Sequence, residues 1–288
     1  MLKVVGLAAS LLVLVHAAPA AAQALDGTLK KVKDSGTLNL GYRESSPPFS
    51  FLGADKRPIG YSIDLCMQVA SAVQKRLNMT DLKLNWVPVT PENRIQAVTN
   101  GTVDLECGST TASLSRQEQV DFSLMTFVDG GSLLTMASTN LKGVGDLAGK
   151  KIGVAPGTTT EKSLAEFLKA EFVQAQTVQV KDHAEGLAAL QSGRIDAYAS
   201  DRGILIGLAL TAGGDLKRFS IGNLAFSYEP YALMLRRNDA AFRLAVNRAL
   251  AELYRTGRIV SVFNRWFGAF GEPSVALQAM YKLNGLPE

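Results

Sequence analysis

The sequence has few of the side chains on which metal sites and nucleophilic catalysis depend. Its 288 residues include two cysteines and two histidines, which excludes a four-cysteine or three-histidine zinc site by counting. A catalytic triad would have to use His183, because His16 lies in the leader described below, and no Gly-x-Ser-x-Gly segment occurs. We therefore expect no metal, no cofactor and no catalytic residue.

A strong excess of one charge and a phosphate-binding loop are also missing. Lys and Arg number 30 against 26 Asp and Glu, and the basic residues are dispersed. Since no aromatic series accompanies them, we expect no nucleic acid partner. Residues 143–148 fit a loose dinucleotide-binding pattern, Gly-x-Gly-x-x-Ala, but they precede a predicted strand where that motif would follow one. Because 47% of the residues are hydrophobic, the chain can bury a sizeable core.

Residues 1–24 have the pattern of a secretory signal peptide. Lys3 gives a positive start, residues 4–15 are apolar and uncharged, and small residues suit cleavage after Ala22 or Ala24. The apolar part is too short to span a bilayer comfortably, and no later run reaches that length. We expect this leader to be removed on export.

Export would place the two cysteines in an oxidising compartment. Such a compartment favours a disulfide over a metal pair or a catalytic thiol. Cys66 falls in the first turn of a predicted helix and Cys107 at the carboxyl end of a predicted strand. In a β-α-β layer those two ends lie on the same side of the sheet. We predict a Cys66–Cys107 bridge that contributes ~2–4 kcal/mol; two buried thiols are the alternative.

Two parts of the sequence repeat one pattern. Residues 99–105 resemble residues 191–197, with Gly, a hydrophobic residue and Asp at matching positions. Both segments follow a predicted helix and lead into a short apolar strand. Upstream, predicted strands at 38–43 and 150–155 each lead to a helix and a further strand. The chain therefore contains two β-α-β-α-β copies, and residues 47–60 form a hairpin inserted in the first.

These copies predict an α/β protein of two β-α-β lobes that face each other across a cleft. Parallel β-α-β units bind ligands at the carboxyl ends of their strands. A strand expected at 231–236 and the helices after it return to the first lobe, so the chain crosses twice, near 127–134 and 224–231. Two crossings make a two-stranded hinge. The predicted lobes are residues 25–128 with 230–288 (lobe 1) and residues 129–229 (lobe 2).

Polar residues gather at the ends of the predicted strands. Residues 107–116 follow a strand of the first copy, and residues 157–161 follow a strand of the second and open a helix. Hydroxyl and free N–H groups at a helix N-terminus suit a carboxylate. Taken alone, this segment is more simply explained by an ordinary helix cap at Thr158 or Thr160.

Charged residues stand at the same ends. Arg43, Arg94 and Arg116 each begin or end a predicted strand or helix. A single arginine of this kind is usually a solvated surface residue, but three indicate an anionic ligand, because guanidinium binds carboxylates bidentately. Asp201, on the other copy, could hold an ammonium group. Nothing in this set proposes a reaction.

Seven motifs carry a resemblance to a known family. They are residues 41–43, 60–65, 93–95, 100–111, 116, 157–159 and 181–183. Through them nearly the whole mature chain resembles the periplasmic solute-binding proteins (family 3) of ABC amino-acid importers, and among these the glutamate/aspartate-binding branch. The resemblance implies the type II periplasmic binding protein fold and a monomer in the periplasm. It implies a protein that is no enzyme and that delivers L-glutamate or L-aspartate to an ABC transporter membrane permease.

The resemblance also assigns eight residues to the ligand. The α-carboxylate would be bound by Ser109, Thr111 and Arg116, with Thr158 assisting, and the α-amino group by Asp201. The side-chain carboxylate would be held by Arg43, Arg94 and His183. The charges agree with this assignment, because two arginines beyond the one that an α-carboxylate needs would be costly in a closed cleft without a second anion.

Some positions depart from the family pattern. Pro91 stands where the branch often has a serine that contacts the ligand, and Ala155 and Pro156 replace a Thr-Ser pair. The lost hydroxyl donors could weaken the site or alter the preference between glutamate and aspartate. His183 could also be a capping residue and not a ligand contact.

Two other classes of function stay open at this stage. A dehydratase-like periplasmic enzyme is known on this fold and would need a general acid in the cleft, for which Glu161 and Glu229 are the nearby carboxylates. They could instead be a first-turn helix charge and a hinge residue. An extracellular sensor domain would carry a membrane-spanning or enzymatic extension, and we expect none.

Overall fold

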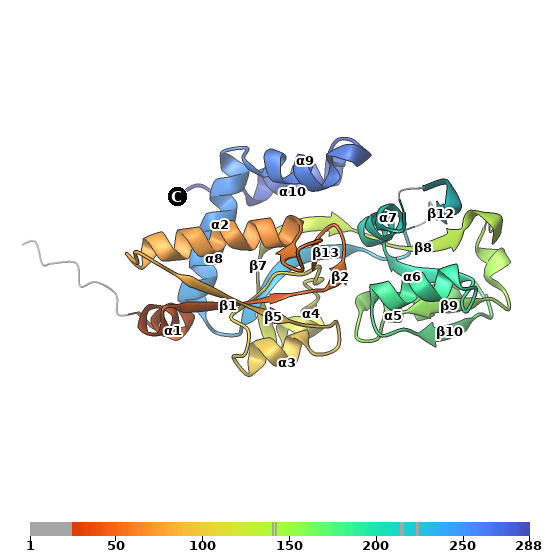
Figure 1. The fold of residues 1–288 in the computed structure, drawn as a ribbon, viewed down its shortest axis with the longest axis horizontal. Coiled ribbons are helices and arrows are strands. Elements are labelled where there is room, and N and C mark those ends of the chain that lie inside the picture. The colour runs from red at the N-terminus through yellow and green to blue at the C-terminus, as the bar shows by residue number, and fades with distance from the viewer. Residues whose placement is uncertain (1–24, 140, 142, 214–215, 223–224) are drawn as a thin grey trace, which may run out of the picture.

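The computed structural model describes residues 25–139, 141, 143–213, 216–222 and 225–288 (Figure 1). The predicted signal peptide, residues 1–24, lies outside the described residues. Among the described helices none is long and apolar enough to cross a membrane.

Two five-stranded sheets organise the molecule, and they lie at opposite ends of its long axis (Figure 1). We call the elements packed on the first sheet lobe 1 and those on the second lobe 2. The first sheet has the order β5-β1-β6-β13-β7. Its strands are β1 (Thr37–Tyr42), β5 (Lys83–Pro88), β6 (Leu105–Glu106), β7 (Val120–Asp129) and β13 (Glu229–Arg236). The second has the order β10-β9-β11-β8-β12, with β8 (Gly131–Met136), β9 (Lys151–Val154), β10 (Gln176–Gln179), β11 (Ala197–Asp201) and β12 (Phe219–Ile221).

Each sheet is parallel on one side and antiparallel on the other. In lobe 1, β1 pairs parallel with β5 and β6, and β13 runs antiparallel between β6 and β7. In lobe 2, β9 pairs parallel with β10 and β11, and β8 runs antiparallel between β11 and β12. The predicted fold class, an α/β protein of two β-α-β lobes, is confirmed; the exact residue limits assigned to each lobe stay predictions.

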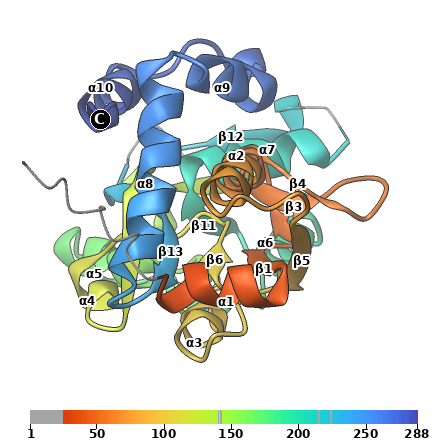
Figure 2. The same ribbon diagram turned by 90° about the vertical axis from the view of Figure 1, so that its left-hand side faces the viewer.

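Helices cover both faces of each sheet. In lobe 1, α2 and α8 pack on one face, and α3 and α4 lie on the other (Figures 1 and 2). In lobe 2, α5 packs on one face, with α6 and α7 on the opposite face. The lobe 1 helices are α1 (Gly27–Ser35), α2 (Tyr61–Arg76), α3 (Arg94–Thr99), α4 (Leu114–Gln117), α8 (Ala240–Arg255), α9 (Ile259–Phe267) and α10 (Val275–Asn284). Those of lobe 2 are α5 (Thr159–Ala170), α6 (His183–Gln191) and α7 (Arg202–Thr211).

Short elements complete the chain. The inserted hairpin is present as a small sheet of β2 (Ser45–Ser46), β3 (Ser50–Leu52) and β4 (Pro58–Ile59). Four 3-10 turns are η1 (Ala137–Thr139), η2 (Val144–Leu147), η3 (Leu216–Arg218) and η4 (Gly268–Phe270).

The chain crosses between the lobes where β7 passes into β8 and again at the start of β13. Glu229 and Asp129 are paired residues of the two crossing segments, at the end of the antiparallel β7–β13 ladder. The crossing segments are therefore held together by a ladder that belongs to lobe 1.

The predicted disulfide is confirmed. Cys66 and Cys107 are bonded, with their Cα atoms 6.1 Å apart, and both side chains are buried. Cys66 is the sixth residue of α2, so it lies in the second turn of the helix and not in the first turn as predicted. The bond fastens α2 to the end of β6, next to the polar loop that follows that strand.

The repeated Gly-x-x-Asp pattern performs the same task in both lobes. Oδ2 of Asp104 accepts a hydrogen bond from the N–H of Asn39 at 2.9 Å, and Oδ2 of Asp196 accepts one from the N–H of Lys151 at 2.8 Å. Each aspartate thus fastens the loop before its own strand to the beginning of the neighbouring parallel strand. The glycines of the two repeats, Gly101 and Gly193, have positive φ angles of 80° and 72°, which other residues rarely adopt.

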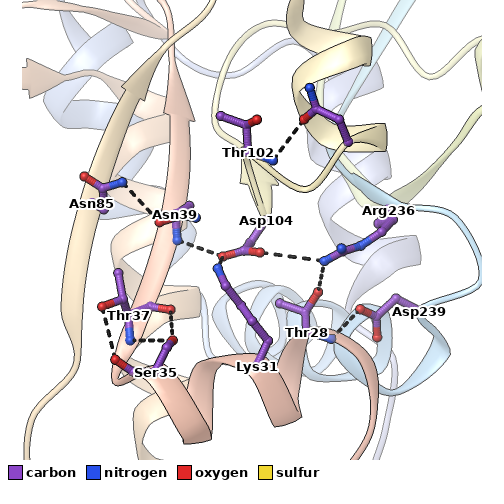
Figure 3. A network of polar contacts seen from close by, with 11 residues as sticks. Thr28, Lys31, Ser35, Thr37, Asn39, Asn85, Thr102, Asp104, Arg236 and Asp239 are labelled. Carbon is purple, nitrogen blue, oxygen red and sulfur yellow. Dashed lines mark hydrogen bonds and ion pairs between the residues drawn. The ribbon is translucent and has the colours of Figure 1, made fainter.

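The two aspartates differ in their surroundings. Asp104 is fully buried and forms ion pairs with Lys31 and Arg236 (Figure 3). Arg236 in turn donates to the hydroxyl of Thr28, which joins α1 to the edge of the network. Lobe 1 therefore has a charged anchor at this end of its sheet, opposite to the end that faces lobe 2.

Candidate ligand-binding cleft

A small cavity lies between the lobes, where the carboxyl ends of β1, β6, β9 and β11 face one another. Its free volume is about 20 Å³, close to the space that one water molecule needs, so the lobes touch across it. Seven of the eight residues predicted to bind ligand line it, and the eighth, Arg116, forms a hydrogen bond with the carbonyl of Thr111, one of the lining residues. The lining residues are Arg43, Arg94, Ser109, Thr111, Thr158, Thr159, Thr160, His183, Ser200, Asp201 and Ile204.

Three arginines from lobe 1 are nearly fully buried at this place. Arg43 follows β1, Arg94 begins α3 and Arg116 lies in α4, with exposed fractions of 2%, 3% and 7%. Burial is the largest cause that lowers the pKa of Arg43 and of Arg116, each to about 10, and the neighbouring charge of Arg94 lowers both further. All three stay positive at neutral pH, so the protein concentrates cationic charge in a space with little water.

The charge of the arginines is only partly balanced by hydrogen bonds. Nε of Arg94 and Oε1 of Glu106 are buried and have no hydrogen-bond partner among the described residues. The other carboxylate oxygen of Glu106 accepts from the hydroxyl of Thr110 at 2.8 Å. A buried donor without a partner costs about 1–3 kcal/mol, so this end of the cleft is suited to an added acceptor.

Arg116 reaches across the cleft to lobe 2. Its Nη2 donates to the carbonyl of Gly157 at 3.2 Å, and its Nη1 donates to the carbonyl of Thr111 at 2.9 Å. Nη2 of Arg94 lies 3.5 Å from the same Gly157 carbonyl. One backbone oxygen at the N-terminus of α5 therefore receives donors from two arginines, and a carboxylate would be a stronger acceptor for them.

The three threonines that open α5 have different tasks. Thr158 is the helix cap: its hydroxyl accepts from the N–H of Glu161 at 3.1 Å and donates to the carbonyl of Ala155 at 2.8 Å. Thr159 points at lobe 1, with its hydroxyl 3.2 Å from that of Thr111. Thr160 donates to Asp201 at 2.8 Å. The sequence analysis missed Thr159 and Thr160, and the run of three threonines was the available signal, because one cap needs one hydroxyl.

Asp201 is the anion that lobe 2 brings to the cavity. Its Oδ1 accepts from Thr160, and its Oδ2 accepts from the hydroxyl of Tyr231. Burial raises its pKa to about 6, and the charge of Glu229 raises it too, against the opposing effect of Tyr231, Thr160 and Arg116. A carboxylate has room for more than two hydrogen bonds, so Asp201 can still accept from an ammonium.

Glu229, at the first position of β13, connects the lobes. Its Oε2 accepts from Thr111 of lobe 1 at 2.5 Å and from Thr159 of lobe 2 at 2.6 Å, and its Oε1 accepts from Ser227 at 2.6 Å. Its side chain is buried. Three accepted hydroxyl bonds favour the hinge interpretation of this residue over that of a general acid.

Glu161, the second carboxylate considered for an enzyme, is also engaged locally. It lies in the first turn of α5 and accepts from the N–H of Gly157 at 3.1 Å and from Nε2 of Gln179, at the end of β10, at 3.0 Å. These bonds favour the interpretation of Glu161 as a charge in the first turn of a helix over that of a general acid. In the described part of the chain no cluster of three His, Cys, Asp or Glu side chains suits a metal ion.

His183 is the first residue of α6 and not its cap, because Asp182 caps that helix by accepting from the N–H of Glu185 at 3.0 Å. The capping alternative for His183 is therefore wrong. Its Nδ1 lies 2.7 Å from the hydroxyl of Tyr198, a residue that the sequence analysis missed. Burial, followed by the charges of Arg43 and Arg94, holds the pKa of His183 well below its usual value, so the ring is neutral.

Two positions that depart from the family pattern, Pro91 and Ala155, contact the loop that precedes α5. Gly157 has a φ of 72°, and a Cβ on it would lie 3.2 Å from the carbonyl oxygen of Pro91. The Pro91 loop of lobe 1 thus approaches the α5 loop of lobe 2 at backbone distance. Ala155 is buried and supplies the carbonyl that Thr158 donates to.

The sequence of the chain is similar to one family of known proteins. Residues 38–269 match the family model of bacterial extracellular solute-binding proteins, family 3. An L-glutamate/L-aspartate-binding protein of Pseudomonas aeruginosa is 41% identical over 87% of this chain and 83% of its own. Glutamate/aspartate import solute-binding proteins of Salmonella typhimurium and Escherichia coli are 37% and 35% identical, over 92% and 86% of this chain and 86% and 82% of theirs.

Solved structures of amino-acid-binding proteins are also similar to this chain. An ancestral arginine-binding protein bound to glutamine matches with a TM-score of 0.72 and 26% identity, over 81% of this chain and 98% of that one. An ancestral amino acid-binding protein described as a precursor of cyclohexadienyl dehydratase matches equally, with a TM-score of 0.72 and 26% identity, over 84% and 100%. A histidine-bound substrate-binding protein of Streptococcus pneumoniae, 24% identical with a TM-score of 0.73 over 83% and 95%, shares the fold.

Proposed function

Because the chain belongs to the bacterial extracellular solute-binding proteins of family 3, we propose that it binds L-glutamate or L-aspartate between its lobes and delivers it to the membrane permease of an ABC transporter. Three buried guanidinium groups around one small cavity carry this proposal. Two of them, Arg43 and Arg94, line this cavity together with one lining carboxylate, that of Asp201. A ligand with two carboxylates and one ammonium complements this arrangement.

Each lobe binds one charged group of the ligand backbone. Arg116 of lobe 1 binds the α-carboxylate, helped by Ser109 and Thr111, and Asp201 of lobe 2 binds the α-ammonium. Charge-assisted hydrogen bonds of this kind contribute about 1.5–3 kcal/mol each. Because the two partners are on opposite lobes, the ligand stabilises the closed form by contacts that the open form lacks.

The hydroxyls at the start of α5 have a supporting part in this proposal. Thr158 was assigned to the α-carboxylate, but both of its hydroxyl bonds are made within its own loop. We assign the ligand-facing hydroxyl to Thr159, and Thr158 then acts by fixing the loop. The side-chain carboxylate lies between Arg43, Arg94 and His183.

We place the mature protein in the periplasm, exported by the leader at residues 1–24, and propose that it acts as a monomer. A single bound amino acid held between two lobes of one chain needs no second subunit. Size measured by light scattering with and without glutamate tests the monomer.

A calorimetric titration with glutamate, aspartate, glutamine, asparagine and arginine tests the ligand. We expect glutamine to bind roughly 30- to 1,000-fold more weakly than glutamate, ~2–4 kcal/mol, because a carboxamide presents a donor to donor-only guanidinium groups. Glutamine or arginine binding as tightly as glutamate would show the assignment of Arg43 and Arg94 to be wrong. Recovery of a chemically changed ligand after incubation would support the enzyme alternative.

A further inference from the structure

His183 and Tyr198 form a buried polar pair in lobe 2. Tyr198 is the second residue of β11 and is fully buried, with its ring against α6. It fits there because residue 186 of α6 is glycine: a Cβ at that position would lie 2.3 Å from the tyrosine ring. The ring is thus fixed by its surroundings, and its hydroxyl is held 2.7 Å from Nδ1 of His183.

The direction of this hydrogen bond follows from the chemistry of the two groups. Both are neutral, since burial lowers the pKa of His183 and raises that of Tyr198. In the described part of the chain His183 Nδ1 is the single hydrogen-bond partner of the Tyr198 hydroxyl. If Nδ1 carried the proton, the buried phenol O–H would have no acceptor, at a cost of about 1–3 kcal/mol. The phenol therefore donates, and Nδ1 accepts.

A neutral imidazole that accepts at Nδ1 carries its proton on Nε2. His183 lines the ligand cavity, and its Nε2 makes no hydrogen bond within the described residues. We propose that Tyr198 is a positioning residue that fixes His183 as the Nε2–H tautomer, so that the ring offers a neutral donor to an anionic ligand side chain. The proposal rests on the proposed function for the identity of that ligand.

The Nε2–H group of His183 reaches the ligand side chain from lobe 2. Arg43 and Arg94 approach from lobe 1, and neither can accept a hydrogen bond. With the tautomer fixed, His183 also presents no acceptor, so the three groups assigned to the ligand side chain are all donors. A carboxylate can accept from all of them, whereas an amide or ammonium side chain would place a donor against a donor. The other tautomer would offer a lone pair and relax this selectivity.

The tautomer can be read directly by nuclear magnetic resonance. Removal of the predicted leader takes away His16, so the mature protein has one imidazole to observe, that of His183. With ¹⁵N-labelled histidine at neutral pH, we expect a protonated Nε2 and an unprotonated Nδ1 for His183, with and without glutamate. A protonated Nδ1 or an imidazolium in this spectrum would overturn the proposal, and this measurement requires no change at the pair itself.

A double-mutant cycle tests the consequence for binding. We expect Tyr198→Phe to give a mixture of tautomers and to weaken glutamate binding about two- to tenfold, the range for one hydrogen bond. In a His183→Gln background the same change should cost little, because the ring that Tyr198 orients is gone. Tyr254→Phe, which removes a buried hydroxyl bond to the Met125 carbonyl in lobe 1, is the matched control and should not alter the tautomer.

The outcomes separate this inference from the proposed function. Unchanged tautomer and affinity in Tyr198→Phe would overturn the inference while glutamate binding by the unaltered protein stands. A protein that does not bind glutamate, but shows the Nε2–H tautomer that Tyr198→Phe removes, would overturn the proposed ligand and leave the pair as assigned.

Discussion

At the scale of single residues, the cleft holds charges that each have an identifiable effect on their neighbours. Asp201 faces Asp129 and Glu229, and all three carboxylates lie where the lobes join. Burial is the largest cause that raises the pKa of Asp129, to about 8, and the charge of Asp201 adds to it. Proton uptake by this group therefore falls within the range of ordinary buffers.

The pH dependence of ligand binding follows from Asp201. Its pKa of about 6 means that it gains a proton, and loses its charge, as the pH falls through that value. We expect glutamate affinity to fall as the pH is lowered from 8 to 5, because the ammonium then loses its ionised partner. Calorimetry across this range measures the midpoint of the fall. An affinity that is constant over the range would remove Asp201 as the ammonium ligand.

The Glu229→Gln variant tests whether the charge of Glu229 contributes to this pH dependence. The charge of Glu229 is the second cause that raises the pKa of Asp201, so its removal should move the fall in affinity to lower pH. Glu166→Gln removes an exposed carboxylate, 69% accessible on α5, and should leave the midpoint where it was. A midpoint shifted to higher pH in Glu229→Gln would contradict the electrostatic explanation.

How far the residues of the site can be predicted from sequence depends on what fixes each side chain. Arg43, Arg94 and Asp201 follow from their places at strand or helix ends, because the topology brings those ends together. Which of Thr158 and Thr159 faces the ligand cannot be predicted in this way, because it depends on which hydroxyl the loop turns toward its own helix. Tyr198 gives no signal either: all five residues of β11 are buried, so its neighbours in sequence mark it as core.

At the scale of elements, the Gly-x-x-Asp repeat can be seen in the sequence, but the hydrogen bonds that its aspartates form cannot. The Gly-x-x-Asp pattern, together with the strands and helices around it, predicted two β-α-β-α-β copies. What the aspartates bind depends on backbone N–H groups of a strand 65 or 45 residues away. The predicted strands at 38–43 and 150–155 are present as β1 and β9, with their ends shifted by one residue. By contrast α7 and α10 were not predicted.

The two repeat aspartates form a matched pair for mutation. Asp104→Asn breaks ion pairs with Lys31 and Arg236 at a fully buried carboxylate, and we expect it to lower the free energy of unfolding by about 1.5–3 kcal/mol. Asp196→Asn alters the equivalent bond at a more exposed place and should cost about 0.5–1.5 kcal/mol. Urea unfolding of both variants measures the difference. Equal losses would mean that the charged anchor of lobe 1 adds nothing.

At the scale of the whole molecule, several hydrogen bonds that cross the cleft lie close to the ligand cavity. Arg116 to Gly157, and Thr111 with Thr159 to Glu229, join the lobes. The crossing segments at Asp129 and Glu229 give the lobes a place to turn.

Closure by the ligand should be visible in solution. We expect small-angle X-ray scattering to give a smaller radius of gyration with glutamate than without, because glutamate bridges Arg116 and Asp201 only when the lobes meet. Leucine, which lacks the second carboxylate, is the control and should leave the radius unchanged at the same concentration. Identical curves with and without glutamate would argue against closure driven by the ligand.

The place of β13 in the first sheet has a consequence for the order in which the chain can fold. Lobe 2 takes all its strands from one continuous stretch, residues 131–221, whereas β13 comes after that stretch and lies between β6 and β7. The sheet of lobe 1 therefore stays open at its middle until residues 229–236 arrive. A chain that leaves a translocation channel N-terminus first presents lobe 2 complete while lobe 1 still waits for its missing strand, and such long-range pairing is slow.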